Sequence, residues 1–343
     1  MRKVVKWLWV SFLFTSGSLW WAKRRLRGNG AVVTLLFHRV LDHSSFSQTL
    51  SQPEIIVTEE TFRKLTAHIA NKFDSVDLKG AAPGTPGRKP KVALTFDDGW
   101  KDNFTVAFPI IRKHRIPAVI FVTSALMDKE NPFWPEQVIG LLREMNPSVD
   151  GAEIETVIES LKKCAPEERE KRLAELSTQA GEKAAALASS GVDRTLSWTE
   201  ILEMNRNGVE IGSHTQTHQI LTTVREDVAR QEVVDSKLAI ERALGKRCEV
   251  LAYPNGNWSP DTRNIVEDSG FKLAFTTEPG LWTAACDPLC VPRVSISEEK
   301  LVGPTGRFSP AMFEYMTIWK AWRATKANGS RARKQAEPSY ALT

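Results

Sequence analysis

Short apolar runs alternate with longer amphipathic stretches along most of this 343-residue chain. Seven runs have the length and apolar content of buried strands, and they lie near residues 32, 92, 119, 210, 250, 272 and 293. Several intervening segments have helical spacing, for example 223–244, which Gly245 closes. Buried strands that alternate with helices are typical of a parallel sheet, so the pattern predicts an α/β fold, a (β/α)7-type barrel.

One connection is too long for a barrel of this kind. Residues 136–189 have a helical, highly charged pattern, which predicts an inserted helical segment at about 131–195. We therefore expect a barrel over 31–300, an apolar and basic segment over 1–30, and an extension over 301–343 with a basic, disordered tail. The insertion places Trp134 where it could help to bind a substrate.

Polar residues of catalytic type follow three of the predicted strands. The run that ends at Phe96 is followed by Asp97, Asp98 and Gly99, and the first strand is followed by His38. Active sites of parallel α/β folds lie at this carboxyl edge of the sheet. Neighbouring residues of a strand point to opposite faces, but at a turn the two acids could divide the roles of metal ligand and base. The alternative is a plain Asp-Asp-Gly turn.

Two histidines follow the strand near residue 210. His214 and His218 are four positions apart, and on one helical turn they would share a face and could bind one metal ion. A surface pair of histidines is the alternative interpretation. With one carboxylate from the earlier motif, they form a ligand set typical of a catalytic zinc site with an open position.

At this point the sequence resembles a known family. Thr-Phe-Asp-Asp-Gly at 95–99, followed by Ser-His-Thr-Gln-Thr-His at 213–218, is similar to the polysaccharide deacetylases, also called the NodB-homology or carbohydrate esterase 4 family. The resemblance extends over roughly 31–296. It implies a distorted (β/α) barrel and metal-dependent removal of N-acetyl groups from a glycan. It assigns Asp97 as general base and Asp98, His214 and His218 as ligands of a divalent metal, expected to be Zn²⁺.

The chain departs from the family in a second motif, Arg-x-x-x-Pro-Tyr. The matching stretch here is 250–255, with Tyr253, Pro254 and Asn255 as candidate substrate-binding residues. Pro254 is kept, so the N–H of Asn255 would hold the oxyanion. Val250 replaces the arginine that orients the base, and Arg293 is the candidate substitute. A surface ion pair is the other interpretation of Arg293.

The family's late histidine, which protonates the leaving amine, is also missing, because no histidine follows His218. Since the first and last strands of a closed barrel are neighbours, His38 is the candidate general acid. A structural role for His38 is the alternative. The missing residue also keeps two other functions open: a glycan-binding pseudoenzyme, and an amidohydrolase acting on a small non-glycan amide.

The two ends of the chain are basic. Residues 1–30 hold seven Lys/Arg and no acid, and 320–343 hold six against Glu337, which leaves 33 basic and 40 acidic residues in the body. This distribution argues against nucleic acid as a partner of the barrel. The apolar, Trp-flanked block at 4–22 predicts contact of residues 1–27 with a membrane surface.

The basic residues after this block lead us to expect a cytoplasmic protein associated with the inner membrane. An inner-membrane anchor with a periplasmic domain is one alternative, and a simple hydrophobic flap on the folded domain is another. No cleavable signal peptide is evident, so we expect the four cysteines to be free thiols, although Cys286 and Cys290 could bridge.

Overall fold

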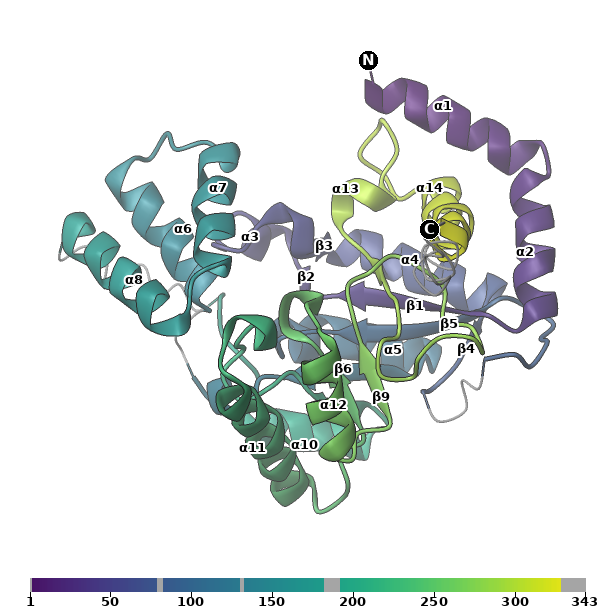
Figure 1. Cartoon of the computed structure of the whole chain (residues 1–343). Helices are drawn as coiled ribbons and strands as arrows, with labels where there is room; N and C mark the ends of the chain where they lie inside the picture. Colours follow the sequence, from purple (N-terminus) through teal and green to yellow (C-terminus); the bar gives the residue numbers. More distant parts are fainter. Residues whose placement is uncertain (1, 79–82, 130–132, 182–191, 328–343) are drawn as a thin grey trace, which may run out of the picture.

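The computed structural model describes residues 2–78, 83–129, 133–181 and 192–327. Seven parallel strands form one curled sheet in the order β10-β1-β5-β6-β7-β8-β9, and β4 (Asp74–Ser75) adds to β5 (Figure 1). These strands are β1 (Val32–Phe37), β5 (Lys91–Phe96), β6 (Ala118–Val122), β7 (Glu210–Ser213), β8 (Val250–Ala252), β9 (Leu273–Phe275) and β10 (Val294–Ser295). Each coincides with a predicted strand, which confirms the parallel barrel-type fold.

The first strand of the sheet lies beside the last, as the sequence predicts. Leu35 of β1 pairs with Val294 of β10, and Phe37 of β1 pairs with Phe96 of β5. On the far side, β9 approaches the segment before β10 through a single bridge between Phe275 and Val291. The sheet is therefore curled into a partly closed barrel, and its carboxyl edge gathers the segments that follow β1, β5, β7 and β8.

Helices surround the sheet (Figure 1) and bury one set of its apolar residues in a large core. Alternate strand residues, including Val32, Phe121 and Phe275, form a second, smaller cluster. Val57 belongs to β3 (Ile56–Thr58), which pairs with β2 (Arg39–Leu41), and a helix begins directly after it at Glu59. The Thr58 hydroxyl caps this helix by accepting from the Thr61 N–H at 3.3 Å. The longer helices around the sheet are α4 (Glu59–Lys72), α5 (Phe108–His114), α10 (Trp198–Arg206), α11 (Glu226–Leu244) and α12 (Pro260–Asp268).

Short helical turns complete the connections. They are α3 (His43–Phe46), η1 (Pro53–Ile55), the π-helical η2 (Asn103–Ala107), η3 (Ser124–Leu126), η4 (Leu221–Thr223), η5 (Pro254–Gly256) and α13 (Glu298–Leu301).

Three helices lie within the predicted insertion: α6 (Trp134–Met145), α7 (Gly151–Lys162) and α8 (Pro166–Ala180). They stand to the side of the sheet in Figure 1. Their apolar side chains form a separate cluster that includes Val138, Ile154 and Ile158, so the insertion has a small core of its own. The rest of the predicted helical stretch, 182–189, lies outside the described residues, and the boundaries 131–195 stay a prediction.

The apolar N-terminal block forms two helices, α1 (Arg2–Thr15) and α2 (Ser18–Asn29), which break at Gly17 in the left-handed region (φ 80°). Both pack against the helical segment formed by α14 (Pro310–Glu314) and the π-helical η6 (Tyr315–Lys320). The Lys23 ammonium lies 2.5 Å from the Glu314 carboxylate. Within the described ranges, no helix is both long and apolar enough to cross a bilayer. The predicted disordered tail falls largely on 328–343, outside the described residues.

Candidate metal and active site

Asp98 leaves the sheet through an unusual backbone conformation. β5 ends at Phe96, and the Asp97 N–H donates to the Phe37 carbonyl of β1 at 2.9 Å. Asp98 then adopts a left-handed conformation (φ 75°), followed by Gly99 with φ 76°. On a regular strand the two carboxylates would point to opposite faces of the sheet. The turn instead places both of them over the carboxyl edge, as the sequence predicts.

Asp98, His214 and His218 converge at this edge. Their candidate ligand atoms all lie within 4.8 Å of one another. The Nε2 atoms of both histidines lie 3.3 Å from Oδ1 of Asp98. One carboxylate and two imidazoles around a common point fit a divalent metal of the zinc class, with room for further ligands. Although burial raises it, hydrogen bonds with both histidines hold the pKa of Asp98 well below its ordinary value.

Neighbouring groups fix the orientation of these ligands. His214 Nδ1 lies 2.8 Å from the Ala252 carbonyl, which can only accept, so Nδ1 is the donor of this bond and Nε2 is the nitrogen that faces the ligand cluster. The Trp100 indole donates to Asp98 Oδ2 at 3.0 Å, which leaves Oδ1 facing the histidines. Metal ligands in proteins are usually oriented in this way, by hydrogen bonds to groups that do not themselves touch the metal.

The prediction that His214 and His218 lie on one helical turn is wrong. Thr215 and His218 both have positive φ, 65° and 64°, and the segment forms a loop. The carboxylate of Glu232 on α11 holds this loop by accepting from the N–H groups of Gln216 at 3.0 Å and Thr217 at 2.8 Å. The two histidines therefore meet because a distant acid organises the loop, and their spacing of four does not reflect a helix.

Asp97 is held by Arg293. The two terminal nitrogens of the guanidinium donate to the two carboxylate oxygens, each at 2.7 Å, and both side chains are buried. Arg293 also donates to the Thr95 hydroxyl at 3.1 Å and to the Thr276 carbonyl at 2.9 Å. Burial raises the pKa of Asp97, but the charge and hydrogen bonds of Arg293, together with the charges of His214 and His38, outweigh burial and lower the pKa. Arg293 is thus buried against the predicted base and is not part of a surface ion pair.

His38 lies next to this group at the end of β1. Because Phe37 and Phe96 are register partners, His38 and Asp97 follow neighbouring strands at the same level. The His38 carbonyl accepts from the Asn103 side-chain amide at 2.8 Å. Burial, with the charges of Arg293 and His214, lowers the pKa of His38 by more than the charges of Asp98 and Asp97 raise it. The structure therefore brings His38 to the carboxyl edge with the other candidates.

The predicted substrate-binding residues differ in their placement. The Tyr253 side chain is fully buried and donates to the Leu289 carbonyl at 3.1 Å, so it is a core residue and does not face a cleft. Pro254 is buried beside it, whereas Asn255 is exposed in a left-handed conformation (φ 56°), with its carbonyl accepting from the Thr277 hydroxyl at 3.2 Å. Asn255 therefore remains the exposed member of this stretch.

Trp134 packs within the helical insertion. The Arg169 guanidinium lies 5.3 Å from its ring centre, and its neighbours belong to the apolar cluster of α6–α8. The preceding residue, Phe133, is the one in contact with the site, because its ring centre is 5.3 Å from that of His218 and 4.9 Å from that of Trp100. The insertion therefore reaches the metal ligands through Phe133.

Sequence reasoning missed a buried charge network next to Trp100. Arg39 is fully buried, pairs with Asp102 at 2.9 Å and with Asp193, and lies 4.2 Å from the Trp100 ring centre. The Ser51 hydroxyl links this network to the buried carboxylate of Glu136 at 2.9 Å. Asp193 is more than 150 positions from Arg39, so no local pattern could reveal this pair.

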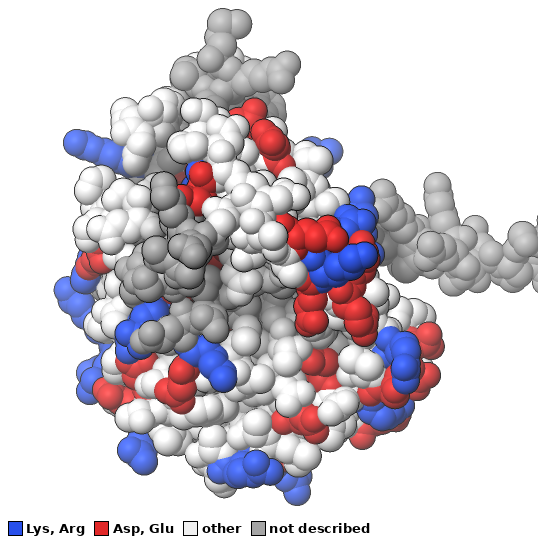
Figure 2. All heavy atoms as spheres, turned by 90° about the vertical axis from the view of Figure 1, so that its left-hand side faces the viewer, with Lys and Arg blue, Asp and Glu red and all other residues white. Residues whose placement is uncertain are grey.

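The face on the side of α6–α8 carries both signs of charge. Figure 2 shows Lys/Arg and Asp/Glu interspersed over it, without one large patch of a single sign. Ion pairs one helical turn apart also occur within α8, between Arg172 and Glu168, and within α11, between Arg230 and Glu226. Such a face does not build the single-sign field that steers a highly charged polymer.

Solved structures of deacetylases resemble this fold. The Streptococcus pyogenes deacetylase PplD, solved in complex with acetate, is 20% identical, with a TM-score of 0.54 over 82% of this chain and 99% of that chain. IcaB from Ammonifex degensii is 19% identical, with a TM-score of 0.53 over 79% of this chain and 93% of that chain. At these identities the likeness concerns the fold.

Sequence comparison identifies the family. YxkH of Bacillus subtilis, which carries the name of a polysaccharide deacetylase, is 22% identical over 199 residues, 57% of this chain. The chain spans 49% of the length of YxkH. The family model for polysaccharide deacetylases matches residues 84–274, more than half of the chain, and this segment includes both the Asp-Asp-Gly and the His-x-x-x-His motifs. The chain therefore belongs to the polysaccharide deacetylase family.

Proposed function

We propose that the protein is a metal-dependent hydrolase that removes N-acetyl groups from a glycan. The observation that carries this proposal is the meeting of Asp98, His214 and His218 beside an arginine-bound Asp97 at the carboxyl edge of the sheet. A carboxylate that remains ionised next to a metal-ligand cluster is the arrangement that hydrolysis of an amide by water requires. The family membership and the acetate bound to the fold relative PplD agree with this chemistry.

Asp98, His214 and His218 would hold the metal, most simply Zn²⁺. When bound, the ion supplies a Lewis acid that polarises the acetyl carbonyl and lowers the pKa of water. Asp97 accepts the proton from the attacking water, because the paired Arg293 keeps the carboxylate ionised and fixes its direction. The bidentate contact occupies both carboxylate oxygens through one lone pair each, so each can still accept another hydrogen bond.

Two further groups complete the proposed site. The backbone N–H of Asn255 donates to the developing oxyanion, from the exposed left-handed turn after β8. His38 gives a proton to the leaving amine as the C–N bond breaks, from the end of β1 next to Asp97. The products are acetate and a free amino group on the glycan.

The N-terminal helices support an accompanying proposal, that the protein binds the cytoplasmic surface of the inner membrane. Large apolar side chains are exposed on α1 and α2, including Leu8, Trp9, Phe12 and Trp20 at 54–61%. The Arg24 guanidinium lies 5.8 Å from the Trp20 ring, so cations accompany the apolar face. Apolar side chains with adjacent arginines suit the interface of a bilayer with anionic lipids.

Acetate release from N-acetylated oligosaccharides tests the proposed activity. The full chain is treated with a chelator, and Zn²⁺ or another divalent metal is then restored. We expect release to stop on chelation and to return with metal. Binding of the oligosaccharide without release under any metal would instead identify a glycan-binding protein. Release from a small acetamide alone would identify a different amidohydrolase.

A further inference from the structure

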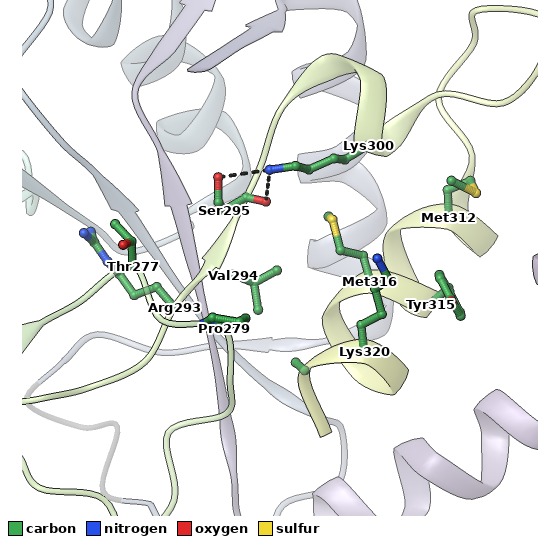
Figure 3. A pocket seen from close by; sticks show the side chains of 11 residues that line it. Thr277, Pro279, Arg293, Val294, Ser295, Lys300, Met312, Tyr315, Met316 and Lys320 are labelled. Atoms are coloured by element: carbon green, nitrogen blue, oxygen red, sulfur yellow. Dashed lines mark hydrogen bonds between the residues drawn. The ribbon is translucent and has the colours of Figure 1, made fainter. Parts of the chain in front are cut away.

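A pocket lined in part by Arg293 lies between β10 and the α14–η6 helical segment. Its volume is about 410 Å³, within the range of ligand sites. Figure 3 shows Val294 and Ser295 on one wall, and Tyr315, Met316 and Lys320 on the helix that forms the other. The proposed deacetylation does not use this pocket.

Besides Arg293, which is paired with Asp97, two cationic side chains line the pocket. The Lys300 ammonium donates to the carbonyl and the hydroxyl of Ser295, at 3.2 and 3.1 Å. Lys320 lies 6.0 Å from the Tyr315 ring centre. In the described ranges, no carboxylate lies within ion-pair distance of either lysine. Burial lowers the pKa of Lys300; the charge of Glu54 opposes this, the charge of Lys320 adds to it, and the charge of Glu299 opposes it. An anion between the two lysines would reduce the repulsion between them.

Most of the other side chains that line the pocket are apolar. Met312 and Met316 line the pocket with Val294, Pro279 and Ala321. Methionines adapt to irregular apolar ligands, such as alkyl chains. The lining helix includes the π-helical η6, and π-helical turns occur frequently at functional sites. Cationic and apolar groups in one pocket suit a ligand that carries both an anionic group and a hydrocarbon chain.

The pocket also connects the two functional regions described above. Arg293, which holds Asp97, and Thr277, whose hydroxyl donates to the Asn255 carbonyl, both belong to its lining. On the other side, α1 and α2 pack against the helical segment that lines it. A ligand in the pocket would therefore lie between the proposed reaction centre and the helices with exposed apolar side chains.

We propose that this pocket binds the phosphate group and the first part of the hydrocarbon chain of a lipid phosphate, and that the glycan substrate is attached to that phosphate. Two ammonium groups that have no carboxylate partner among the described residues, together with a neighbouring hydroxyl, suit a phosphate group. The substrate half of this inference rests on the proposed deacetylase function, whereas the binding half does not.

Calorimetric titration of the full chain with decyl phosphate, below its micelle concentration, tests the binding half. We expect saturable binding, weakened about tenfold or more by Lys320→Gln and further by Lys300→Gln with Lys320→Gln, as for loss of a charge-assisted hydrogen bond. Lys326→Gln, a loss of the same charge beyond the pocket lining, should bind like the unchanged protein. Equal affinity in all variants would overturn the site. Equal binding of inorganic phosphate would overturn the hydrocarbon part, and equal binding of neutral decyl maltoside the phosphate part.

The substrate half requires a second measurement. An N-acetylated disaccharide is joined either to decyl phosphate or, through a neutral ether, to decanol, and acetate release is compared at equal concentrations. We expect kcat/KM to favour the phosphate-linked compound about tenfold or more, and Lys320→Gln to remove this preference. No preference would overturn the lipid-phosphate substrate. Acetate from neither compound would refute the deacetylase activity, while the titration still decides the binding site.

Discussion

Arg293 and Asp97 form a two-pronged, buried ion pair across 196 positions of sequence, with both nitrogen–oxygen distances at 2.7 Å. The remaining donor contacts of the arginine go to Thr95 and Thr276, so the pair is anchored to β5 and to the end of β9. The arginine does not come from the strand that carries this role in the family motif, where Val250 stands. The residue just before β10 thus contacts the proposed base instead.

Replacing Arg293 by Met should destabilise the protein strongly. The change leaves Asp97 buried without its counter-ion, and breaking a buried pair in this way costs about 3–5 kcal/mol. Adding Asp97→Asn to Arg293→Met removes the unpaired charge and should restore part of the loss. The free energy of unfolding in urea at neutral pH measures both effects. A double variant no more stable than Arg293→Met would show that the charge of Asp97 is not the cause.

His214→Ala should abolish tight metal binding. It removes one of three converging ligands, and Asp98 with His218 alone makes a much weaker site. Elemental analysis after dialysis against Zn²⁺ gives the metal content, and circular dichroism checks the fold. His43→Ala is the matched control, because His43 is exposed and lies outside the ligand cluster. Full metal content in His214→Ala would refute the assignment.

His38→Gln should keep the metal but lose roughly 10²- to 10⁴-fold in the rate of amide hydrolysis, the usual scale for a general acid. An ester analogue should lose less, because an alkoxide-type leaving group needs protonation less than an amine does. The two rates, measured on substrates with the same sugar, separate this role from a structural one. Equal losses on amide and ester would return His38 to a structural role.

Glu136 should make stability depend on pH. It is 4% exposed, and burial raises its pKa to about 7 from an ordinary value of 4.5. Burial therefore favours the neutral form of Glu136 in the folded state. The stability that this neutral form contributes is complete below pH 4.5 and is lost as the pH rises through 7. The decrease amounts to about 3 kcal/mol at most.

Glu136→Gln mimics the neutral acid and can still accept from Ser51. We therefore expect it to unfold like the unchanged protein at acidic pH and to be more stable above pH 8. Urea unfolding at the two pH values provides the comparison. A variant that shows no gain at alkaline pH would mean that Glu136 ionises in the folded protein without cost.

Replacing Leu8, Phe12 and Trp20 together by Ser should weaken binding to vesicles that contain anionic phospholipid. Each change removes exposed apolar surface that the membrane would cover, and the combined loss should be about tenfold or more. Leu238→Ser on α11 is the control, since Leu238 is 49% exposed but lies far from α1 in sequence. Deleting the helices is a poorer test, because Ala22 and Leu26 belong to the main core. Unchanged sedimentation with vesicles would refute the membrane role.

Local patterns predicted the sheet well. Apolar runs that end in turn-forming residues have few structural alternatives, so all seven strands could be expected. The turn at Gly99 after β5 likewise predicts that Asp98 lies at the carboxyl edge of the sheet. The loop at 214–218 could not, because it depends on left-handed residues and on Glu232 of a later helix. Tyr253 likewise resembles a binding residue by motif, yet its side chain fills the core.

The position of β1 between β5 and β10 affects how the protein becomes active. β1 can pair with β5 early, since 59 positions separate Val32 from Lys91, but Leu35 meets Val294 only across 259 positions. Such distant pairing is slow to form. Until β10 docks, Asp97 has no arginine beside it, even if the metal ligands have already assembled. An intermediate of this kind could capture metal and still fail to turn over, so metal content would overestimate the fraction of competent molecules during refolding.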